Sequence, residues 1–247
     1  MNWSWLLPSG KGIPVLMYHK VWPGVTDSLT ITPEDMRQQW DLLKKEGYYT
    51  VSLPEYLDIA TGEKSYTGKP LLLTFDDGYL NNQVYVYPLL KEFGWQGTFF
   101  IIANTLSGVT ATDTGGPGQL MALEQLKRLD PAIVQLAMHG YAHENMGNAT
   151  LAETQEALQL SLNAFESSGL AWHRVLAYPY GAMPGKHFPQ LKRIMAEMGI
   201  KAAFRIGNKV SEVPAPDMYE LKRIDIKGTD TVADFKIKIK KGKLKPF

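Results

Sequence analysis

The chain contains no cysteine, which excludes disulfides, thiolate metal sites and cysteine nucleophiles. It also lacks an excess of either charge, because 26 lysines and arginines face 25 acidic residues and leave a net charge of +1. This balance gives no global reason to expect nucleic acid as a partner. No apolar run approaches the roughly 20 residues that a transmembrane helix needs. Residues 1–8 lack the basic and apolar regions of an export signal, so we expect a protein that stays inside the cell or one whose signal has been removed.

What the chain does contain is a regular alternation of strand-like and helix-like segments. This alternation predicts an α/β protein with a mostly parallel sheet and crossover helices. About seven such units favour a closed, TIM-like (β/α)7 barrel, with an open sheet as the alternative. We expect one domain over residues 1–247, with a core at about 13–226 and a basic segment at 229–247. The predicted strands lie at 13–18, 48–51, 71–75, 98–102, 133–138, 174–178, 202–206 and 219–224.

Two adjacent carboxylates, Asp76 and Asp77, end the predicted strand at 71–75 and precede Gly78. A buried carboxylate without a partner costs several kcal/mol. Because successive side chains of an extended chain point to opposite sides, one carboxylate could bind a cation while the other handles a proton. Asp and Gly are also common at ordinary strand-to-turn corners, so this pair alone does not establish a site.

A pair of histidines follows the strand predicted at 133–138. His139 and His143 are four residues apart, so one helical turn would point both imidazoles the same way. The carboxyl ends of the strands in a parallel barrel gather at one rim, where active sites lie. We therefore expect both histidines to meet Asp77 there. Two histidines and one carboxylate are typical ligands of a catalytic Zn²⁺ or another borderline divalent metal.

Two further segments should reach the same rim. His19 follows the strand at 13–18, although a packed structural histidine is the simpler interpretation of that residue alone. Pro179 and Tyr180 follow the strand at 174–178, where proline interrupts backbone pairing; an ordinary strand-to-loop exit is the alternative. His173 and His187 lie away from the predicted rim, and we expect them to be structural or exposed.

The basic C-terminal segment fits two structures. Residues 235–240 alternate between apolar residues and lysine like a strand, whereas residues 231–234 resemble a helix cap. For the lysines from Lys236 to Lys245 we expect a solvated face, with contact to an anionic polymer or membrane surface as the alternative.

The motifs at the predicted rim resemble those of the polysaccharide deacetylase family, carbohydrate esterase family 4. They are Thr-Phe-Asp-Asp-Gly at 74–78, the histidine pair at 139 and 143, and Tyr-Pro-Tyr-Gly at 178–181. The segment Pro-Val-Leu-Met-Tyr-His-Lys-Val at 14–21 further resembles the branch that deacetylates poly-β-1,6-N-acetylglucosamine. In that branch the barrel is circularly permuted, and a histidine near the N-terminus replaces one that other members carry near the C-terminus. The resemblance covers about residues 13–226 and implies that permuted barrel here.

The resemblance also implies a reaction, which is the removal of N-acetyl groups from N-acetylglucosamine-containing polysaccharide or oligosaccharide with release of acetate. It implies a divalent metal, with Zn²⁺ expected and Co²⁺ or Ni²⁺ as alternatives, and a glycan as the partner. The roles implied for the matched residues are Asp76 as general base, His19 as general acid, Asp77, His139 and His143 as metal ligands, the Tyr180 backbone N–H as an oxyanion donor, and Pro179 and Tyr180 as substrate contacts.

One departure from the family pattern concerns the base. The family usually carries an arginine two residues before the proline of the Tyr-Pro-Tyr segment, and this chain has Ala177 there. That arginine holds the base, and an arginine beside Asp76 would keep it ionised. We expect Arg223, near the end of the last strand, to replace it, with Arg205 as the second choice. The family's tryptophan motif has no clear match either.

Three other functions compete with this hypothesis. Relatives that cleave non-sugar amides such as cyclic ureides usually lack the full set of metal ligands. A catalytically silent carbohydrate-binding barrel would need neither Asp76 nor His19. An Fe(II) oxygenase could use two histidines and an aspartate, but such enzymes typically have H-x-D spacing on antiparallel folds, which this chain does not show. The sequence carries no signal for an oligomeric state.

Overall fold

The computed structural model describes residues 12–108 and 116–242, and its centre is a closed barrel of seven parallel strands. The barrel closes where β2 pairs with β6, with Val15 opposite Leu72 and Tyr18 opposite Phe75. The predicted (β/α)7 barrel is therefore confirmed, and the open sheet is wrong. In spatial order the barrel strands are β2 (Val15–Tyr18), β12 (Leu221–Asp225), β10 (Ala202–Ile206), β9 (Trp172–Ala177), β8 (Val134–Met138), β7 (Gly97–Ile101) and β6 (Lys69–Phe75).

One predicted strand lies outside the barrel. The segment predicted at 48–51 forms β5 (Tyr48–Thr50), which pairs only with the first residues of β6, Tyr48 opposite Lys69. Two other short pairs join loops, β1 (Gly12–Ile13) with β11 (Ser211–Glu212) and β3 (Lys20–Val21) with β4 (Thr30–Ile31).

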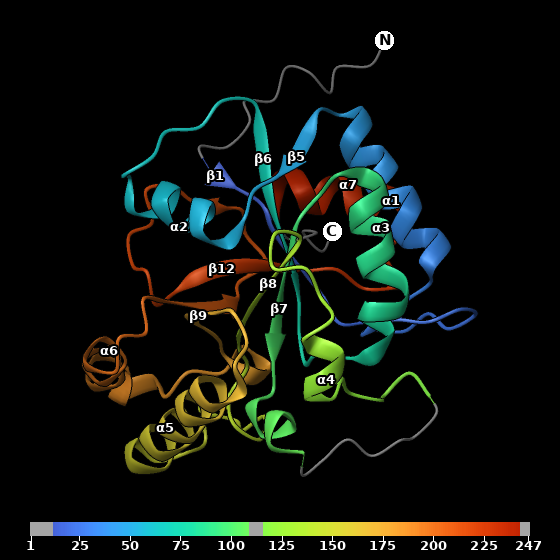
Figure 1. Ribbon diagram of the computed structural model, residues 1–247. Helices are drawn as coiled ribbons and strands as arrows, with labels where there is room; N and C mark the ends of the chain where they lie inside the picture. Colours follow the sequence, from blue (N-terminus) through green and yellow to red (C-terminus); the bar gives the residue numbers. More distant parts are fainter. Residues whose placement is uncertain (1–11, 109–115, 243–247) are drawn as a thin grey trace.

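Helices surround the barrel (Figure 1). Helix α1 begins after Thr32, whose side chain accepts a hydrogen bond from the Asp35 N–H, and α5 begins with a capping box formed by Thr150 and Glu153. These caps satisfy backbone donors at the helix start. Helix α4 is a single turn that spans Leu123–Leu126. The other helices are α1 (Pro33–Lys45), α2 (Leu53–Thr61), α3 (Tyr87–Phe93), α5 (Leu151–Ser168), α6 (Phe188–Glu197) and α7 (Val232–Lys241).

Apolar side chains form two layers on the two faces of the barrel wall. Alternate strand residues such as Leu72 and Phe204 fill the interior, where α2 adds Tyr56. The strand residues in between, such as Leu73, point outward and pack against the surrounding helices, including Trp40 of α1. Both faces of each strand are buried, which explains the continuous apolar runs in the sequence. Truncation of Leu73 to alanine should therefore lower the free energy of unfolding by about 2–5 kcal/mol.

The C-terminal segment forms the helix α7, so the strand-like alternation at 235–240 was misleading. Thr231 and Asp234 form a capping box, and Phe235 and Ile239 are buried four residues apart on one helical face. The expected solvated lysine face is wrong for Lys238, which is buried on the same side. Lys243 and Lys245 lie outside the described residues. None of the described helices combines the length and apolar character needed to cross a bilayer.

Candidate metal centre and active site

Strand ends bring the predicted site residues together at one rim of the barrel. Asp76 and Asp77 follow β6, and His139 follows β8. Because the strands are parallel, these distant segments finish at the same end. The remaining predicted residues are His19 after β2, His143 in the loop after β8, Pro179 and Tyr180 after β9, and Arg223 within β12.

Asp77, His139 and His143 form a compact group of possible metal ligands. Their ligand atoms all lie within 4.8 Å of one another. The Oδ1 atom of Asp77 is 3.3 Å from Nε2 of His139 and 3.2 Å from Nε2 of His143. Asp77 and His139 are buried, whereas His143 is partly exposed. Such a group can hold one divalent ion and leave a side open to solvent, as catalytic zinc sites do.

Hydrogen bonding supports a metal rather than a structural role for this group. Nδ1 of His139 lies 2.9 Å from the carbonyl oxygen of Ala177. Since a carbonyl can only accept, Nδ1 carries the proton, and in the neutral ring Nε2 is left with a lone pair that faces Asp77. Oδ1 of Asp77 is itself buried, and the described residues provide no hydrogen bond to it. A cation at this point would satisfy all three atoms.

Electrostatics within the group also favour a cation. Burial by itself would raise the pKa of Asp77, but the two facing imidazoles hold that pKa well below its ordinary value. Burial also lowers the pKa of His139, and the carboxylates of Asp76 and Asp77 outweigh it, so the pKa lies above the ordinary value. A proton on His139 would compete with a metal for Nε2.

The backbone is strained at three residues of the site. Asp77, His143 and Tyr180 have φ angles of 72°, 61° and 59°, a region that residues other than glycine seldom adopt. Such conformations cost about 1–3 kcal/mol each and concentrate at functional sites. Gly78 also has a positive φ, and a Cβ there would lie 2.9 Å from Ile101. The turn that presents Asp77 therefore requires glycine at position 78.

Asp76 is held by a buried arginine from the opposite side of the site. Two nitrogens of Arg223 donate to the two carboxylate oxygens of Asp76 at 2.6 and 2.7 Å. Burial alone would raise the pKa of Asp76, but Arg223 and the nearby His139 keep it below the ordinary value. Arg223 thus lies where the arginine missing at Ala177 would act. Arg205, the second choice, instead pairs with Glu220 at 3.1 Å.

His19 faces the other side of Asp76, with its Nε2 4.0 Å from Oδ2 of that carboxylate. Burial lowers the pKa of His19, while Asp76 and Asp77 act in the opposite direction. Its Nδ1 is buried and receives no partner among the described residues. Burial raises the pKa of Asp225, and the interaction of that carboxylate with His19 lowers it, so the two groups lie within electrostatic reach.

Asp225 pairs with Met17 of β2, two residues before His19, and was not among the residues predicted for the site. Arg223 and Asp225 are two residues apart on β12, so both side chains point to the same side of the strand. The alternation of charged residues near the end of this strand was the available signal. Tyr79 was also missed, although it directly follows the Asp76-Asp77-Gly78 turn, and Lys20 lies 5.2 Å above its ring.

Tyr180 and Pro179 border the open side of the metal group. Tyr180 is 63% exposed as a residue, and its ring centroid lies 4.5 Å from that of His143. Pro179 is buried beside Gly140, where a Cβ would lie 3.2 Å from its ring. His173 is partly buried and His187 is exposed; neither is among the three residues whose ligand atoms come together.

Comparison with protein families identifies the relationship. Residues 63–203, more than half of the chain, match the model of the polysaccharide deacetylase family. The chain belongs to the polysaccharide deacetylase family.

Two curated relatives support this assignment. YxkH of Bacillus subtilis (strain 168), whose name places it provisionally among the polysaccharide deacetylases, is 25% identical over 188 residues, or 76% of this chain and 63% of YxkH. The poly-β-1,6-N-acetyl-D-glucosamine N-deacetylase of Escherichia coli (strain K12) is 30% identical over 87 residues. That match covers 34% of this chain and only 13% of the E. coli protein.

Solved structures agree on the fold. The Streptococcus pyogenes deacetylase PplD, determined with acetate, has a TM-score of 0.76 at 22% identity and covers 92% of this chain and 98% of its own. IcaB from Ammonifex degensii has a TM-score of 0.73 at 23% identity, with 92% and 95% covered. Both likenesses extend over the barrel as a whole.

Proposed function

We propose that this chain is a metal-dependent hydrolase that removes N-acetyl groups from N-acetylglucosamine-containing polysaccharide or oligosaccharide and releases acetate. The observation that carries the proposal is the meeting of Asp77, His139 and His143 beside Asp76, which Arg223 holds. A carbohydrate-binding module needs neither a set of converging metal ligands nor an ionised buried carboxylate. We take residues 1–247 as one catalytic domain.

Asp77, His139 and His143 are the residues that would hold the metal. Two imidazoles and a carboxylate suit Zn²⁺ and also Co²⁺ or Ni²⁺. When bound, such an ion supplies a Lewis acid that makes water more acidic and polarises the acetyl carbonyl. The Ala177 carbonyl, which accepts from Nδ1 of His139, fixes the ring orientation and leaves Nε2 for the ion.

Asp76 is assigned the role of general base. The water oxygen forms a bond to the acetyl carbonyl carbon, and a carboxylate oxygen of Asp76 takes the proton that the water gives up. Arg223 keeps this carboxylate ionised and oriented, because both guanidinium hydrogen bonds are made in a buried place. Negative charge develops on the carbonyl oxygen during attack, and the backbone N–H of Tyr180 is the donor assigned to it.

His19 is assigned the role of general acid. The bond between the carbonyl carbon and nitrogen breaks, and a proton from His19 goes to the nitrogen as the amine departs. The products are acetate and a free amino sugar. Asp225, which interacts with His19 electrostatically, would favour its protonated form during this step.

The glycan substrate is supported by the family and by the open side of the site. The exposed ring of Tyr180 lies beside His143 and offers a surface on which a sugar ring could pack, with Pro179 buried next to it. The name of the E. coli relative points to poly-β-1,6-linked N-acetylglucosamine, and we propose this polymer as the first substrate to test.

Acetate release tests the proposal directly. Purified protein is incubated with β-1,6-linked and chitin-type N-acetylglucosamine oligomers, after chelation and after return of Zn²⁺, Co²⁺ or Ni²⁺. We expect activity that disappears on chelation and returns with metal. Asp76→Asn should retain metal and lose turnover, His139→Ala should lose both, and His187→Ala, an exposed histidine, should lose neither.

Other outcomes would redirect the proposal. Glycan binding without acetate release by metal-loaded protein would identify a binding module. Ring opening of cyclic ureides to the corresponding ureido acids, with no acetate from either sugar oligomer, would identify a hydrolase of non-sugar amides. Native turnover by Asp76→Asn would show that the base is another residue.

A further inference from the structure

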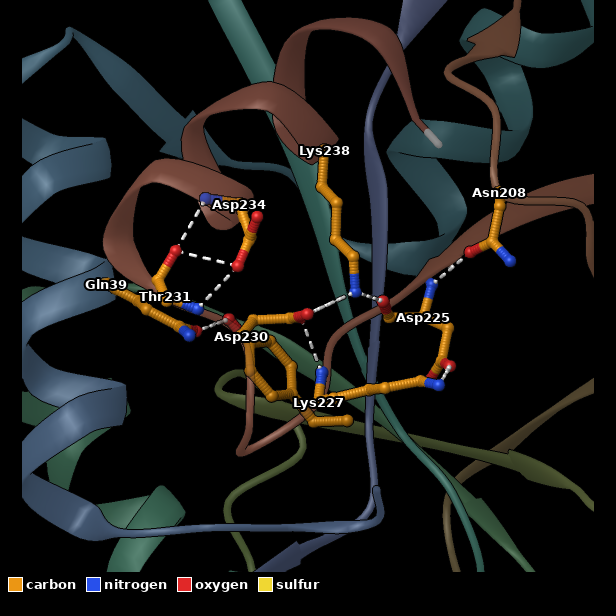
Figure 2. A network of polar contacts seen from close by, with 9 residues as sticks. Gln39, Asn208, Asp225, Lys227, Asp230, Thr231, Asp234 and Lys238 are labelled. Atoms are coloured by element: carbon orange, nitrogen blue, oxygen red, sulfur yellow. Dashed lines mark hydrogen bonds and ion pairs between the residues drawn. The ribbon is translucent and has the colours of Figure 1, made fainter. Parts of the chain in front are cut away.

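A buried lysine connects the C-terminal helix α7 to the active site. The ammonium group of Lys238 lies 2.8 and 2.6 Å from the two carboxylate oxygens of Asp230. It also donates a hydrogen bond of 2.8 Å to the backbone carbonyl of Asp225. Figure 2 shows Lys238 reaching from the helix to both partners. All three donors of the ammonium group are therefore used.

Lys238 is not an ordinary surface lysine, because its side chain and that of its partner Asp230 are both largely buried. The side chains of Lys238 and Asp230 are 10% and 7% exposed. Desolvation of two charges offsets much of their attraction, so such a pair is weak evidence for stability by itself. This lysine differs from an ordinary paired lysine in its third hydrogen bond, which goes to the last residue of β12 rather than to the segment just before α7 that contains Asp230.

The residue held in this way belongs to the active site. Asp225 pairs with Met17 of the neighbouring strand β2, two residues before His19, and His19 lowers the pKa of the Asp225 carboxyl. Arg223, two residues earlier on the same side of β12, holds Asp76. Asp225 is the last residue of β12 that pairs with β2, so the regular pairing of the strands ends at its carbonyl group. Lys238 supplies a charged donor at this point.

Asn208 holds the same stretch of β12 by its other backbone groups. Its Oδ1 accepts a hydrogen bond of 3.0 Å from the Asp225 N–H, and its own N–H donates to the Arg223 carbonyl at 2.9 Å. Gly242, at the end of α7, packs so closely against Asn208 that a Cβ on this glycine would collide with the Asn208 carbonyl oxygen. Helix α7 thus supports the end of β12 directly through Lys238 and indirectly through Asn208.

We propose that Lys238 is a positioning residue for the deacetylation reaction, because its hydrogen bond to the Asp225 carbonyl sets the Asp225 side chain relative to His19. This inference rests on the proposed function. Lys238 touches neither the substrate nor the metal ligands, and it acts through Asp225. Displacement of a supporting group by about 1 Å can cost roughly 100-fold in rate.

Four variants separate positioning from stability. Lys238→Met removes the ammonium group and keeps most of the side-chain volume. Lys238→Arg retains a charged donor. Lys238→Met combined with Asp230→Asn removes both buried charges and leaves neither without a partner. This double variant therefore tests the role of Lys238 even if the single variant fails to fold. Lys236→Met is the matched control, because Lys236 lies on the same helix and is exposed.

The measurements are kcat and KM for acetate release from an N-acetylglucosamine oligomer and from p-nitrophenyl acetate, together with bound metal and thermal unfolding. The amine of the oligomer must gain a proton to leave, whereas p-nitrophenolate leaves without one. Loss of His19 positioning should therefore slow the amide reaction more than the ester reaction. A general effect on folding would slow both equally.

We expect Lys238→Met and the double variant to lose at least about tenfold in kcat for the oligomer, which is part of the roughly 100- to 10,000-fold that general acid catalysis supplies. The ester rate, KM and metal content should change little, Lys238→Arg should recover most of the loss, and Lys236→Met should match the native protein. Oligomer turnover by folded Lys238→Met at the native rate, or equal losses on both substrates, would overturn the inference alone. Native protein that releases acetate from neither substrate would overturn the proposed function and the inference with it.

Discussion

Replacement of Arg223 by methionine tests the buried pair that holds the proposed base. The variant keeps an apolar side chain of similar length but removes both hydrogen bonds to Asp76, of 2.6 and 2.7 Å. Arg223 is fully buried and Asp76 is 2% exposed. Breaking a buried ion pair from one side costs about 3–5 kcal/mol, because the other charge is left without a partner. That is a large part of the roughly 5–15 kcal/mol by which a domain is stable.

The loss should depend on pH in a defined direction. Arg223 holds the pKa of Asp76 below its ordinary value, against the effect of burial. The pair therefore stabilises the native fold above the unfolded-state pKa of Asp76, and this contribution is lost as pH falls through the lower folded-state value. In Arg223→Met burial acts without Arg223, so the pKa of Asp76 should rise. The acid limb of kcat/KM should then move to higher pH.

The matched control is Arg205→Met. Arg205 pairs with Glu220 at 3.1 Å, and both side chains are about one third exposed, so its loss should cost only about 0–1 kcal/mol. Urea unfolding near neutral pH gives the two free energies, and acetate release across pH gives the limbs. Equal costs for the two variants, or an acid limb that stays in place in Arg223→Met, would refute the reasoning.

Three further changes probe the rest of the site. Burial lowers the pKa of His19, so activity that needs the His19 proton should fall as pH rises through a pKa below the ordinary histidine value. His19→Gln should abolish this alkaline limb of the pH profile. An unchanged alkaline limb in the variant would assign the limb to another group. Asp225→Asn should slow amide turnover by about tenfold or more while metal content stays the same, since it removes charge beside the acid; full turnover would remove Asp225 from the site. Gly78→Ala should weaken metal binding, measured by competition with a chelator, because position 78 has a φ of 82° and little space beside Ile101; native affinity would show that the turn tolerates a side chain.

The sequence predicted which residues lie close together because this prediction depended on strand ends rather than on side-chain detail. Apolar runs of five or six residues marked the barrel strands, and the residues that ended them, Asp76, Asp77 and His139, lie together in the structure. All strands of a parallel barrel have their carboxyl ends at the same rim, so the closeness of these residues could be predicted without the structure. The choice of Arg223 followed the same logic, since it lies near the end of the last strand.

The parts that escaped prediction depend on packing between distant segments. The alternating lysines at 235–240 fit a strand period, but the capping box at Thr231 and the burial of Phe235 and Ile239 four residues apart favour a helix. In the sequence Lys238 looks like the other lysines of this segment. Only its contacts with Asp230 and the end of β12 in the structure distinguish it. The pairing of β5 with β6 outside the barrel likewise has no local signature, because a short apolar strand looks the same in either place.

The central claim is that Asp77, His139 and His143 hold one divalent metal on which acetate release depends. The most direct measurement is the rate of acetate release as metal-free protein is titrated with Zn²⁺ and bound metal per chain is counted. We predict that the rate rises in proportion to bound metal and reaches its maximum at about one ion per chain, and that His143→Ala shows neither tight binding nor this rise. Full activity in metal-free protein, or native zinc affinity in His143→Ala, would contradict the claim.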